Sequence, residues 1–424
     1  MKRFLALAMS CVLALGALAG CGGGGSGGDS GEKVIKVGVF ECTTGENGGG
    51  GQLEVNGIQY ANQIKPTVNI GGEEYKVELV ISDNKSDKSE AANAASYLVN
   101  EGCSIVLGSY GSAVSIAAGS VFKEAEIPAI GCSCTNPQVT LGNDFYFRVC
   151  FLDSFQAKVL AYYAIQQGYT NAAVLTQVGD DYSIGLGQFF EQYFTQFGGT
   201  IVSSQNFPAN NSDYSALLQN IKASGAQCVF APSSITAAPV ILQQAQSLGL
   251  EAVFMGPDTW DNADMINTAE GGAAGCTEGL ICSTFFDDSG DDVADFVNGY
   301  KEAFSTDTVN VVTALGYDAY MTAIQAIEAA GSTKGTDIRD ALVDVSFTGV
   351  TGPIAFDENG DVSKDSAVLK TAQGGKLVYA DTVTVADVQE EENPQLGASG
   401  RGRKSPAPLI PPPRLDMGGL PLWI

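Results

Sequence analysis

The chain of 424 residues contains no histidine, only two tryptophans, and 22 basic residues against 48 acidic ones. Without histidine, Ser-His-Asp and Cys-His nucleophile pairs and histidine-ligated zinc sites are excluded, and with them most familiar hydrolases. The formal net charge of −26 repels phosphate backbones, so we expect no nucleic-acid partner. With 45% apolar and 17% charged residues, the bulk of the chain is globular, and its length is typical of two or three domains.

An apolar run long enough for a comfortable membrane span is missing from the N-terminus. The run Phe4–Leu15 has twelve residues and follows the basic segment Met1-Lys2-Arg3. The next motif, Leu18-Ala19-Gly20-Cys21, resembles the lipobox of bacterial lipoproteins, in which the cysteine is lipidated and becomes the mature N-terminus. A plain secretory signal or a short membrane helix is the alternative.

The lipobox predicts the organisation of both ends of the chain. We expect a signal peptide over 1–20, a lipid anchor at Cys21, and a flexible glycine-rich tether over 21–32. The protein would then be extracytoplasmic, held at the outer face of the cell membrane or in the periplasm. Residues 389–424 include a proline-rich, basic segment without periodicity, which predicts a disordered tail.

Short β-rich runs alternate with helix-period segments through the body of the chain. The expected strands cover 34–40, 75–82, 104–108, 127–130, 171–176, 200–207, 228–231 and 252–255. The expected helices cover 52–65, 86–101, 112–124, 154–167, 182–197, 213–223 and 237–248. Such alternation predicts an α/β fold with two doubly wound, parallel-sheet lobes. Ligands of such lobes bind beyond the carboxyl ends of the strands, so the cleft between the lobes is the expected site.

Seven motifs follow these elements in order. They are Val106-Leu-Gly-Ser-Tyr-Gly-Ser112, Ile127-Pro-Ala-Ile-Gly-Cys-Ser-Cys-Thr135, Phe145-Tyr-Phe-Arg-Val149, Gly179-Asp-Asp-Tyr-Ser-Ile-Gly185, Phe254-Met-Gly-Pro-Asp258, Gly316-Tyr-Asp-Ala-Tyr320 and Gly352-Pro-Ile-Ala-Phe-Asp357-Glu-Asn-Gly360. Together they resemble the type I periplasmic binding proteins of ABC importers, in particular the Leu/Ile/Val-binding (branched-chain amino acid) family. The resemblance covers roughly residues 33–385.

The resemblance implies a binding protein that delivers an amino acid to the transmembrane subunits of an ABC permease. It implies no catalysis and no cofactor, and we expect a monomer. Lobe one would cover 33–150 plus 286–352 and lobe two 151–285 plus 353–388. Crossings near 149–153, 282–287 and 351–356 would form a three-crossing hinge.

Seven residues are implied as ligand contacts. For the carboxylate of an amino acid, Ser112 aligns with the family's carboxylate-binding serine, and the loop of Tyr110 and Gly111 opens the helix that follows. For the ammonium, the implied acceptors are Thr135, the carbonyl of Ser133, and Asp258 from the other lobe.

Tyr182 would lie over the ligand at the lip of the second lobe. Each of these residues also has a structural alternative. Ser112 and Asp258 would then be helix caps, Thr135 a turn residue, and Tyr182 the first residue of its helix.

The side-chain end of the pocket departs from the family. Where the family often has an aromatic residue, the first loop reads Gly45-Glu-Asn-Gly-Gly-Gly-Gly51, and the missing aromatic ring predicts a larger or looser pocket. The loop also lacks the lysine of a P-loop, so phosphate binding is not expected. Tyr110, Trp260 and Tyr317 are candidate apolar walls. Leucine, isoleucine or valine is therefore not assumed as the ligand.

The remaining candidates point only weakly to chemistry. The pair Cys132 and Cys134 has the look of a redox or metal site, but without nearby partners free thiols are favoured. The run 287–292 is acidic, and a solvated loop is favoured over calcium binding. Two alternatives to transport of an amino acid stay open: a ligand-sensing module that works with a separate receptor, and a site for an amide or small peptide.

Overall fold

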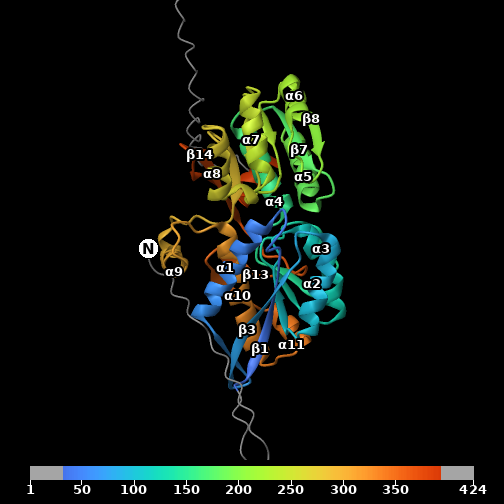
Figure 1. The fold of residues 1–424 in the computed structure, drawn as a ribbon, viewed down its shortest axis with the longest axis vertical. Coiled ribbons are helices and arrows are strands. Elements are labelled where there is room, and N and C mark those ends of the chain that lie inside the picture. The colour runs from blue at the N-terminus through green and yellow to red at the C-terminus, as the bar shows by residue number, and fades with distance from the viewer. Residues whose placement is uncertain (1–31, 393–424) are drawn as a thin grey trace, which may run out of the picture. The chain divides into compact units, whose positions relative to one another are not determined.

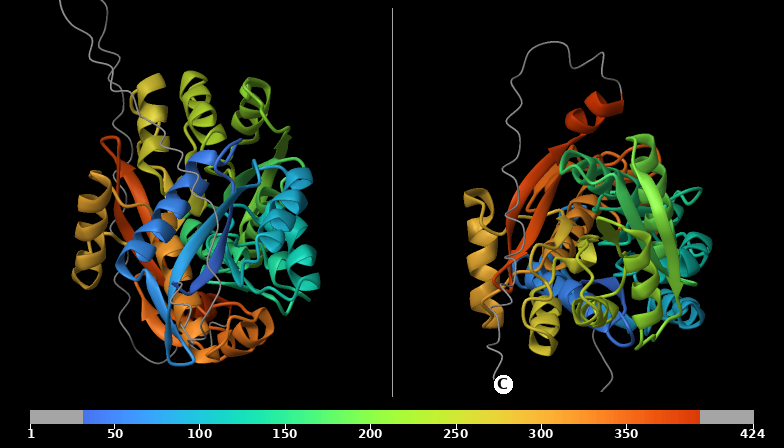
Figure 2. Two further views of the ribbon diagram at one scale, coloured as in Figure 1. Left: turned by 60° about the horizontal axis from the view of Figure 1, so that its bottom comes forward. Right: turned by 90° about the horizontal axis from the view of Figure 1, so that it is seen from above.

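Residues 32–392 are described by a computed structural model, and within that range two large β-sheets carry helices on both faces (Figures 1 and 2). The predicted signal peptide, Cys21, residues 21–31 of the tether and residues 393–424 lie outside the described residues. The two large sheets are mainly parallel, which confirms the α/β class that the alternating pattern predicts.

The first sheet, in the described part of the chain, has six strands in the order β2-β3-β1-β4-β5-β6. These strands are β1 (Val34–Glu41), β2 (Thr67–Ile70), β3 (Glu73–Asp83), β4 (Ile105–Leu107), β5 (Ala129–Gly131) and β6 (Tyr146–Arg148). Its helices are α1 (Gly48–Ile64), α2 (Lys88–Asn100), α3 (Ser112–Glu124), α9 (Ala294–Phe304), α10 (Val311–Ala330) and α11 (Gly335–Leu342). We call this unit the first lobe.

The second sheet, again counted over the described residues, has seven strands in the order β15-β14-β11-β10-β9-β7-β8. These strands are β7 (Asn171–Gln177), β8 (Thr200–Phe207), β9 (Cys228–Phe230), β10 (Val253–Gly256), β11 (Ile281–Thr284), β14 (Ser366–Gln373) and β15 (Lys376–Thr384). Its helices are α4 (Asp153–Gln166), α5 (Asp181–Gln196), α6 (Ser215–Ser224), α7 (Ala237–Ser247), α8 (Ala263–Gly272) and α12 (Val385–Glu392). We call this unit the second lobe.

Antiparallel strands at one edge of each sheet modify the parallel architecture that the sequence predicts. Strand β2 pairs antiparallel with β3, and β14 pairs antiparallel with both β11 and β15. Both hairpins turn on two glycines with positive φ, Gly71-Gly72 and Gly374-Gly375. Two consecutive residues with positive φ are typical of the tight turn that matches strand twist, and glycine adopts it without strain.

Both faces of each sheet are buried, which explains the continuous apolar runs in the sequence. In β1, Val37 and Val39 pack into one core, while Phe40 packs into another on the opposite face. In β7, Val174 and Leu175 divide between two cores in the same way. This alternation leaves the carboxyl ends of the strands as the place where polar side chains gather.

The third crossing between the lobes comes later than the sequence predicts. The hairpin of β12 (Ser346–Gly349) and β13 (Gly352–Ala355) is followed by Asp361, which forms a parallel bridge with Arg148 of β6. Ile354 and Val362 lie in the first-lobe core. Residues 353–362 therefore pack with the first lobe and not with the second lobe, to which we assigned them, because their buried contacts lie in the first-lobe core.

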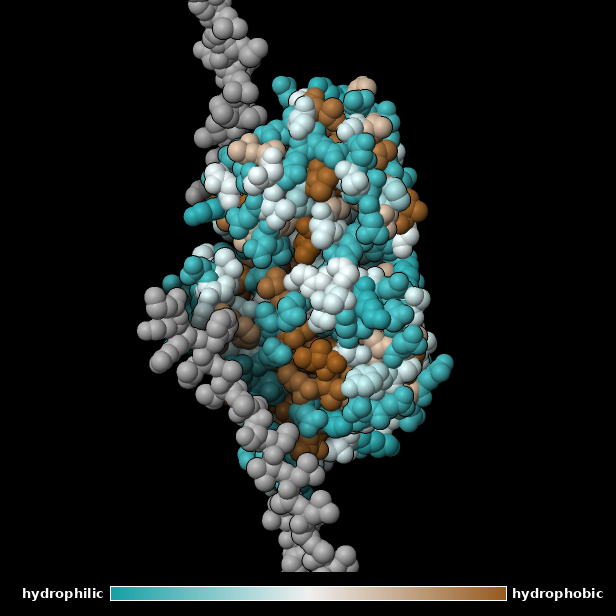
Figure 3. Space-filling model, viewed as in Figure 1, coloured by the Kyte–Doolittle hydropathy of each residue, from teal (hydrophilic) through white to brown (hydrophobic). Residues whose placement is uncertain are grey.

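The predicted start of the disordered tail at residue 389 is also wrong. Helix α12 continues to Glu392 and so includes the first residues of that tail. None of the helices within 32–392 has the length and apolar character needed to cross a membrane. In the space-filling view, polar residues cover most of the visible face, and apolar residues form groups among them (Figure 3).

Candidate functional site

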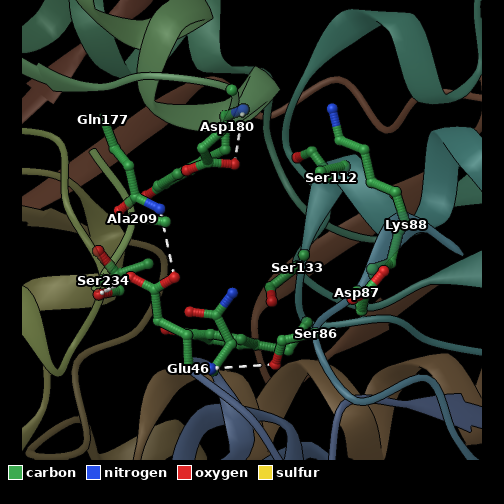
Figure 4. A pocket seen from close by; sticks show the side chains of 18 of the residues that line it. Glu46, Ser86, Asp87, Lys88, Ser112, Ser133, Gln177, Asp180, Ala209 and Ser234 are labelled. Carbon is green, nitrogen blue, oxygen red and sulfur yellow. Dashed lines mark hydrogen bonds between the residues drawn. The ribbon is translucent and has the colours of Figure 1, made fainter. Parts of the chain in front are cut away.

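A cavity of about 310 Å³ lies between strand-end loops of the two lobes (Figure 4). The loops after β1, β3, β4 and β5 contribute from the first lobe, and those after β7, β8, β9 and β10 from the second. The lining residues are Glu46, Asn47, Ser86, Asp87, Lys88, Tyr110, Gly111, Ser112, Ala113, Val114, Ser133, Gln177, Val178, Gly179, Asp180, Tyr182, Ala209, Ser234, Asp258 and Thr259. The cavity thus lies where parallel strands of both sheets end.

Six of the seven predicted contact residues line this cavity, and Thr135 does not. Thr135 is fully buried, and its Oγ1 has no hydrogen-bond partner. Its carbonyl accepts a hydrogen bond from the amide of Asp153 at 3.0 Å. The neighbouring carbonyls of Cys134 and Asn136 are both held by the guanidinium of Arg148, at 2.9 and 2.7 Å. Arg148 thus anchors the backbone on both sides of Thr135, and of this loop Ser133 lines the cavity while Thr135 does not.

Ser112 is the first residue of α3, whereas the N-cap position belongs to Gly111. The hydroxyl oxygen of Ser112 accepts a hydrogen bond from the amide of Asn136 at 3.1 Å. Its own proton is therefore available to a ligand, as are the unpaired amides of the first helical turn. The cap alternative for Ser112 is wrong, and the helix start at the cavity is suited to an anion.

Asp258 opens a short 3-10 helix, Asp258–Trp260, and its side chain does not cap it. The carboxylate accepts hydrogen bonds from the hydroxyl of Tyr182 at 2.7 Å and from the amide of Gln156 at 3.0 Å. Asp258 is only 2% exposed, and burial raises its pKa to about 6. Burial also raises the pKa of neighbouring Asp153, to about 8. At pH 7, Asp258 is therefore ionised and Asp153 is neutral.

The raised pKa predicts a pH dependence of binding. A ligand ammonium needs the ionised form of Asp258, and in the ligand-free protein this carboxyl takes up a proton as the pH falls through about 6. Affinity for an amino acid should therefore be about tenfold weaker at pH 5 than at pH 7. Calorimetric titration across this range measures the change, and Asp258→Asn should flatten the profile. An affinity that rises toward pH 5 would contradict this role of Asp258.

Two buried glutamates support the cavity wall from inside the first lobe. Glu41 accepts hydrogen bonds from the amide of Tyr110 at 2.8 Å and the hydroxyl of Ser109 at 3.3 Å. Glu54 accepts one from the hydroxyl of Ser133. Each glutamate has one further oxygen that is buried without a partner. The pair holds the two loops that carry the predicted Tyr110 and Ser133.

Neither glutamate has a cation among its hydrogen-bond partners, so a proton held by the pair lowers its negative charge. Burial raises the pKa of Glu54 to about 7, and burial together with the charge of Glu54 raises the pKa of Glu41 well above its ordinary value. Two adjacent carboxylates in such a site share a proton, which also satisfies the unpaired oxygens. The Sγ of Cys132 lies within 4.8 Å of a carboxyl oxygen of each, and burial raises its pKa as well.

The cysteines that the structure describes, including Cys132 and Cys134, are free thiols.

The glycines of the first loop bring an aromatic wall close instead of leaving a gap. A side-chain carbon at Gly50 would meet the ring of Tyr110 at 2.4 Å. Tyr110 therefore packs over the start of α1 and lines the cavity. Of the other candidate walls, Trp260 is fully buried in the second-lobe core, and Tyr317 packs against Phe296 with ring centroids 4.9 Å apart.

Several contacts that the sequence did not predict join the lobes around the cavity. The carboxylate of Glu46 accepts hydrogen bonds from Gln177 at 3.2 Å and Ser234 at 2.9 Å. Lys88 forms an ion pair with Asp181 at 2.7 Å. Each contact joins a first-lobe residue to a second-lobe residue, so these side chains bridge the two lobes. In the sequence, the feature that points to Glu46 is its position, an acidic residue between the end of a strand and a run of glycines.

Comparison with known proteins finds one protein family and individual relatives that are binding proteins of the same kind. The model of the periplasmic binding protein family matches residues 34–376. A leucine-, isoleucine-, valine-, threonine- and alanine-binding protein of Pseudomonas aeruginosa is 26% identical over 332 residues, which cover 77% of this chain and 87% of that protein.

Two solved structures have the same fold over their full length. The leucine-binding protein LivK of Thermotoga maritima is 33% identical with a TM-score of 0.77, covering 84% of this chain and 100% of that one. The branched-chain amino acid transporter substrate-binding protein LivJ of Streptococcus pneumoniae, solved with isoleucine, is 26% identical with a TM-score of 0.75, covering 83% and 100%. Proteins of this family bind substrates and are not enzymes, and the chain belongs to the periplasmic binding protein family.

Proposed function

We propose that the protein captures an amino acid between its two lobes and delivers it to the permease of an ABC importer. One observation carries this proposal: an anion site and a cation site face the same cavity from opposite lobes. The anion site is the start of α3 with the hydroxyl of Ser112, and the cation site is the buried carboxylate of Asp258. An amino-acid zwitterion has the two charges that this arrangement complements.

Ser133 offers one further acceptor for an ammonium group on the first-lobe side of the cavity. Tyr182 already donates to Asp258, which fixes the carboxylate in place. Ser133 lines the cavity on the first-lobe side, and its hydroxyl is engaged by Glu54, so its carbonyl is the group proposed to accept from the ligand. The Ser133 carbonyl and the two carboxylate oxygens of Asp258 would together accept hydrogen bonds from the three N–H bonds of an ammonium group.

The relatives support an amino acid as the class of ligand. Their names state leucine, isoleucine, valine, threonine and alanine, and one is solved with isoleucine. Closure about the three crossings, with the lobes moving as units, would bury the ligand and form the surface that a permease recognises.

Thermal-shift screening of the mature protein against the common amino acids tests this proposal. A ligand at one hundred times its Kd should stabilise the folded state by about 2.7 kcal/mol. Stabilisation by one or a few amino acids supports the proposal, and no shift with any of them, after removal of co-purified ligand by unfolding and refolding, would refute it.

We also propose that Cys21 carries lipid and holds a monomeric protein at the outer face of the membrane. The lipobox Leu18-Ala19-Gly20-Cys21 and the glycine-rich segment after it support this proposal. Cys21→Ser should release the protein from the membrane fraction of expressing cells, and two acyl signals are needed for stable anchoring. Unchanged membrane association of the variant would refute the anchor, and light scattering of the soluble form measures its oligomeric state.

A further inference from the structure

One side of the cavity is built from polar groups that the proposed zwitterion sites do not use. Figure 4 shows Glu46, Gln177 and Ser234 together on one side, with Ser112, Ser133 and Lys88 on the other. The Glu46 carboxylate accepts hydrogen bonds from the Gln177 amide at 3.2 Å and the Ser234 hydroxyl at 2.9 Å. An apolar ligand side chain that extends to this side of the cavity would lie against these groups.

The charges around the cavity are unevenly compensated. Asp87 and Asp180 both accept hydrogen bonds from backbone amides of the helices they cap, α2 and α5. The lining cation Lys88 is paired with Asp181. Two lining carboxylates, Asp258 and Glu46, have only neutral side-chain donors as hydrogen-bond partners. The α-ammonium of a ligand would compensate Asp258, and Glu46 would remain.

A carboxylate has about four positions at which it accepts hydrogen bonds, and Glu46 uses two of them within the protein. Closure over an aliphatic side chain would remove water from the remaining positions without replacing it, which is unfavourable for a charged group. A ligand group with N–H or O–H bonds would replace that water.

We propose that the ligand is an amino acid whose side chain ends in a hydrogen-bond donor, which Glu46 accepts. This inference rests on the proposed function and names its substrate class. The donor is an N–H or O–H group, carried either by a cationic side chain or by a neutral one. The interlobe bonds of Glu46 place this recognition at the closure interface, so a fitting side chain would also stabilise the closed form.

Calorimetric titration with pairs of similar shape tests the inference: lysine against norleucine, and threonine against valine. Glutamine and leucine are added as a neutral donor and an aliphatic reference. In the native protein, a donor-bearing amino acid should bind at least tenfold more tightly than its apolar counterpart and more tightly than leucine. Glu46→Leu should remove that preference, while the same change at the exposed Glu251 should leave it unchanged.

Glu46→Gln keeps the shape and an acceptor oxygen, so it serves if the leucine variant does not fold. This variant also distinguishes a cationic donor side chain from a neutral one, because it should weaken the binding of a cationic side chain at least tenfold and that of a neutral side chain less. Tighter binding of the apolar member in both pairs, or a preference that survives Glu46→Leu, would overturn the inference while leaving the proposed function intact. Binding of no amino acid at all would refute the proposed function itself.

Discussion

Replacing Asp258 by asparagine should weaken amino-acid binding by about 2–5 kcal/mol, since it removes the charge that pairs with a buried ammonium. Asp258 is 2% exposed, and its hydrogen-bond partners Tyr182 and Gln156 are neutral. The variant therefore keeps the size of the side chain and loses its charge in a site with little water. Calorimetric titration at pH 7 with the amino acid found in the thermal-shift screen measures the loss.

Two variants serve as controls for this result. Tyr182→Phe removes one hydrogen bond at 2.7 Å and should cost about 1 kcal/mol, because the charge of Asp258 remains. Asp264→Asn lies in the nearby helix α8 at an exposed position and should change nothing measurable. An Asp258→Asn protein with unchanged affinity would reduce Asp258 to a structural residue.

Replacing Arg148 by methionine should lower the free energy of unfolding by about 3–5 kcal/mol, because it leaves a buried carboxylate without its cation. Arg148 is fully buried, and its Nε lies 2.5 Å from Asp361. It also donates to the carbonyls of Cys134 and Asn136 and to the hydroxyl of Thr140. It thus joins the loop that carries Ser133 to the late segment of the first lobe.

Urea unfolding followed by circular dichroism measures this change. Lys65→Ala is the control, since its ion pair with Glu328 at 3.3 Å is partly exposed and should contribute at most about 1 kcal/mol. If the two variants are destabilised equally, the buried network around Arg148 does not hold the loop as described.

The local pattern of the sequence predicts most of the parallel strands and the helices between them, but not the antiparallel strands at the sheet edges. The expected helix 112–124 and strand 200–207 match α3 and β8 at both ends, because each is bounded by clear turn signals. The antiparallel edge strands were missed, although Gly71-Gly72 between two β-rich runs is a hairpin signal. The third crossing was placed too early, because Asp361 meets Arg148 across 213 residues and no local signal marks such a contact.

The site was predictable where it depends on strand ends and motif resemblance. Ser112 and Asp258 lie 146 positions apart in the sequence, and the topology brings both to one cavity. The resemblance predicts Thr135 as a ligand contact, but Thr135 does not line the cavity. Arg148 binds the carbonyls on either side of it, which no local pattern indicates. Glu54 was missed because an acid within a helix is usually solvated, and only tertiary packing shows that it is buried. The hydrogen bonds of Glu46 reach Gln177 and Ser234 in the other lobe, and no local pattern predicts such partners.

The most direct test of the account is a calorimetric titration with an amino acid and its two blocked derivatives. The parent amino acid should bind with one-to-one stoichiometry. Its amide lacks the anionic group proposed to meet the start of α3, and its N-acetyl form lacks the cation proposed to meet Asp258. We expect each derivative to bind at least about a hundredfold more weakly, which is about 2.7 kcal/mol. Equal affinity for the parent and both derivatives would contradict capture of a zwitterion between the lobes.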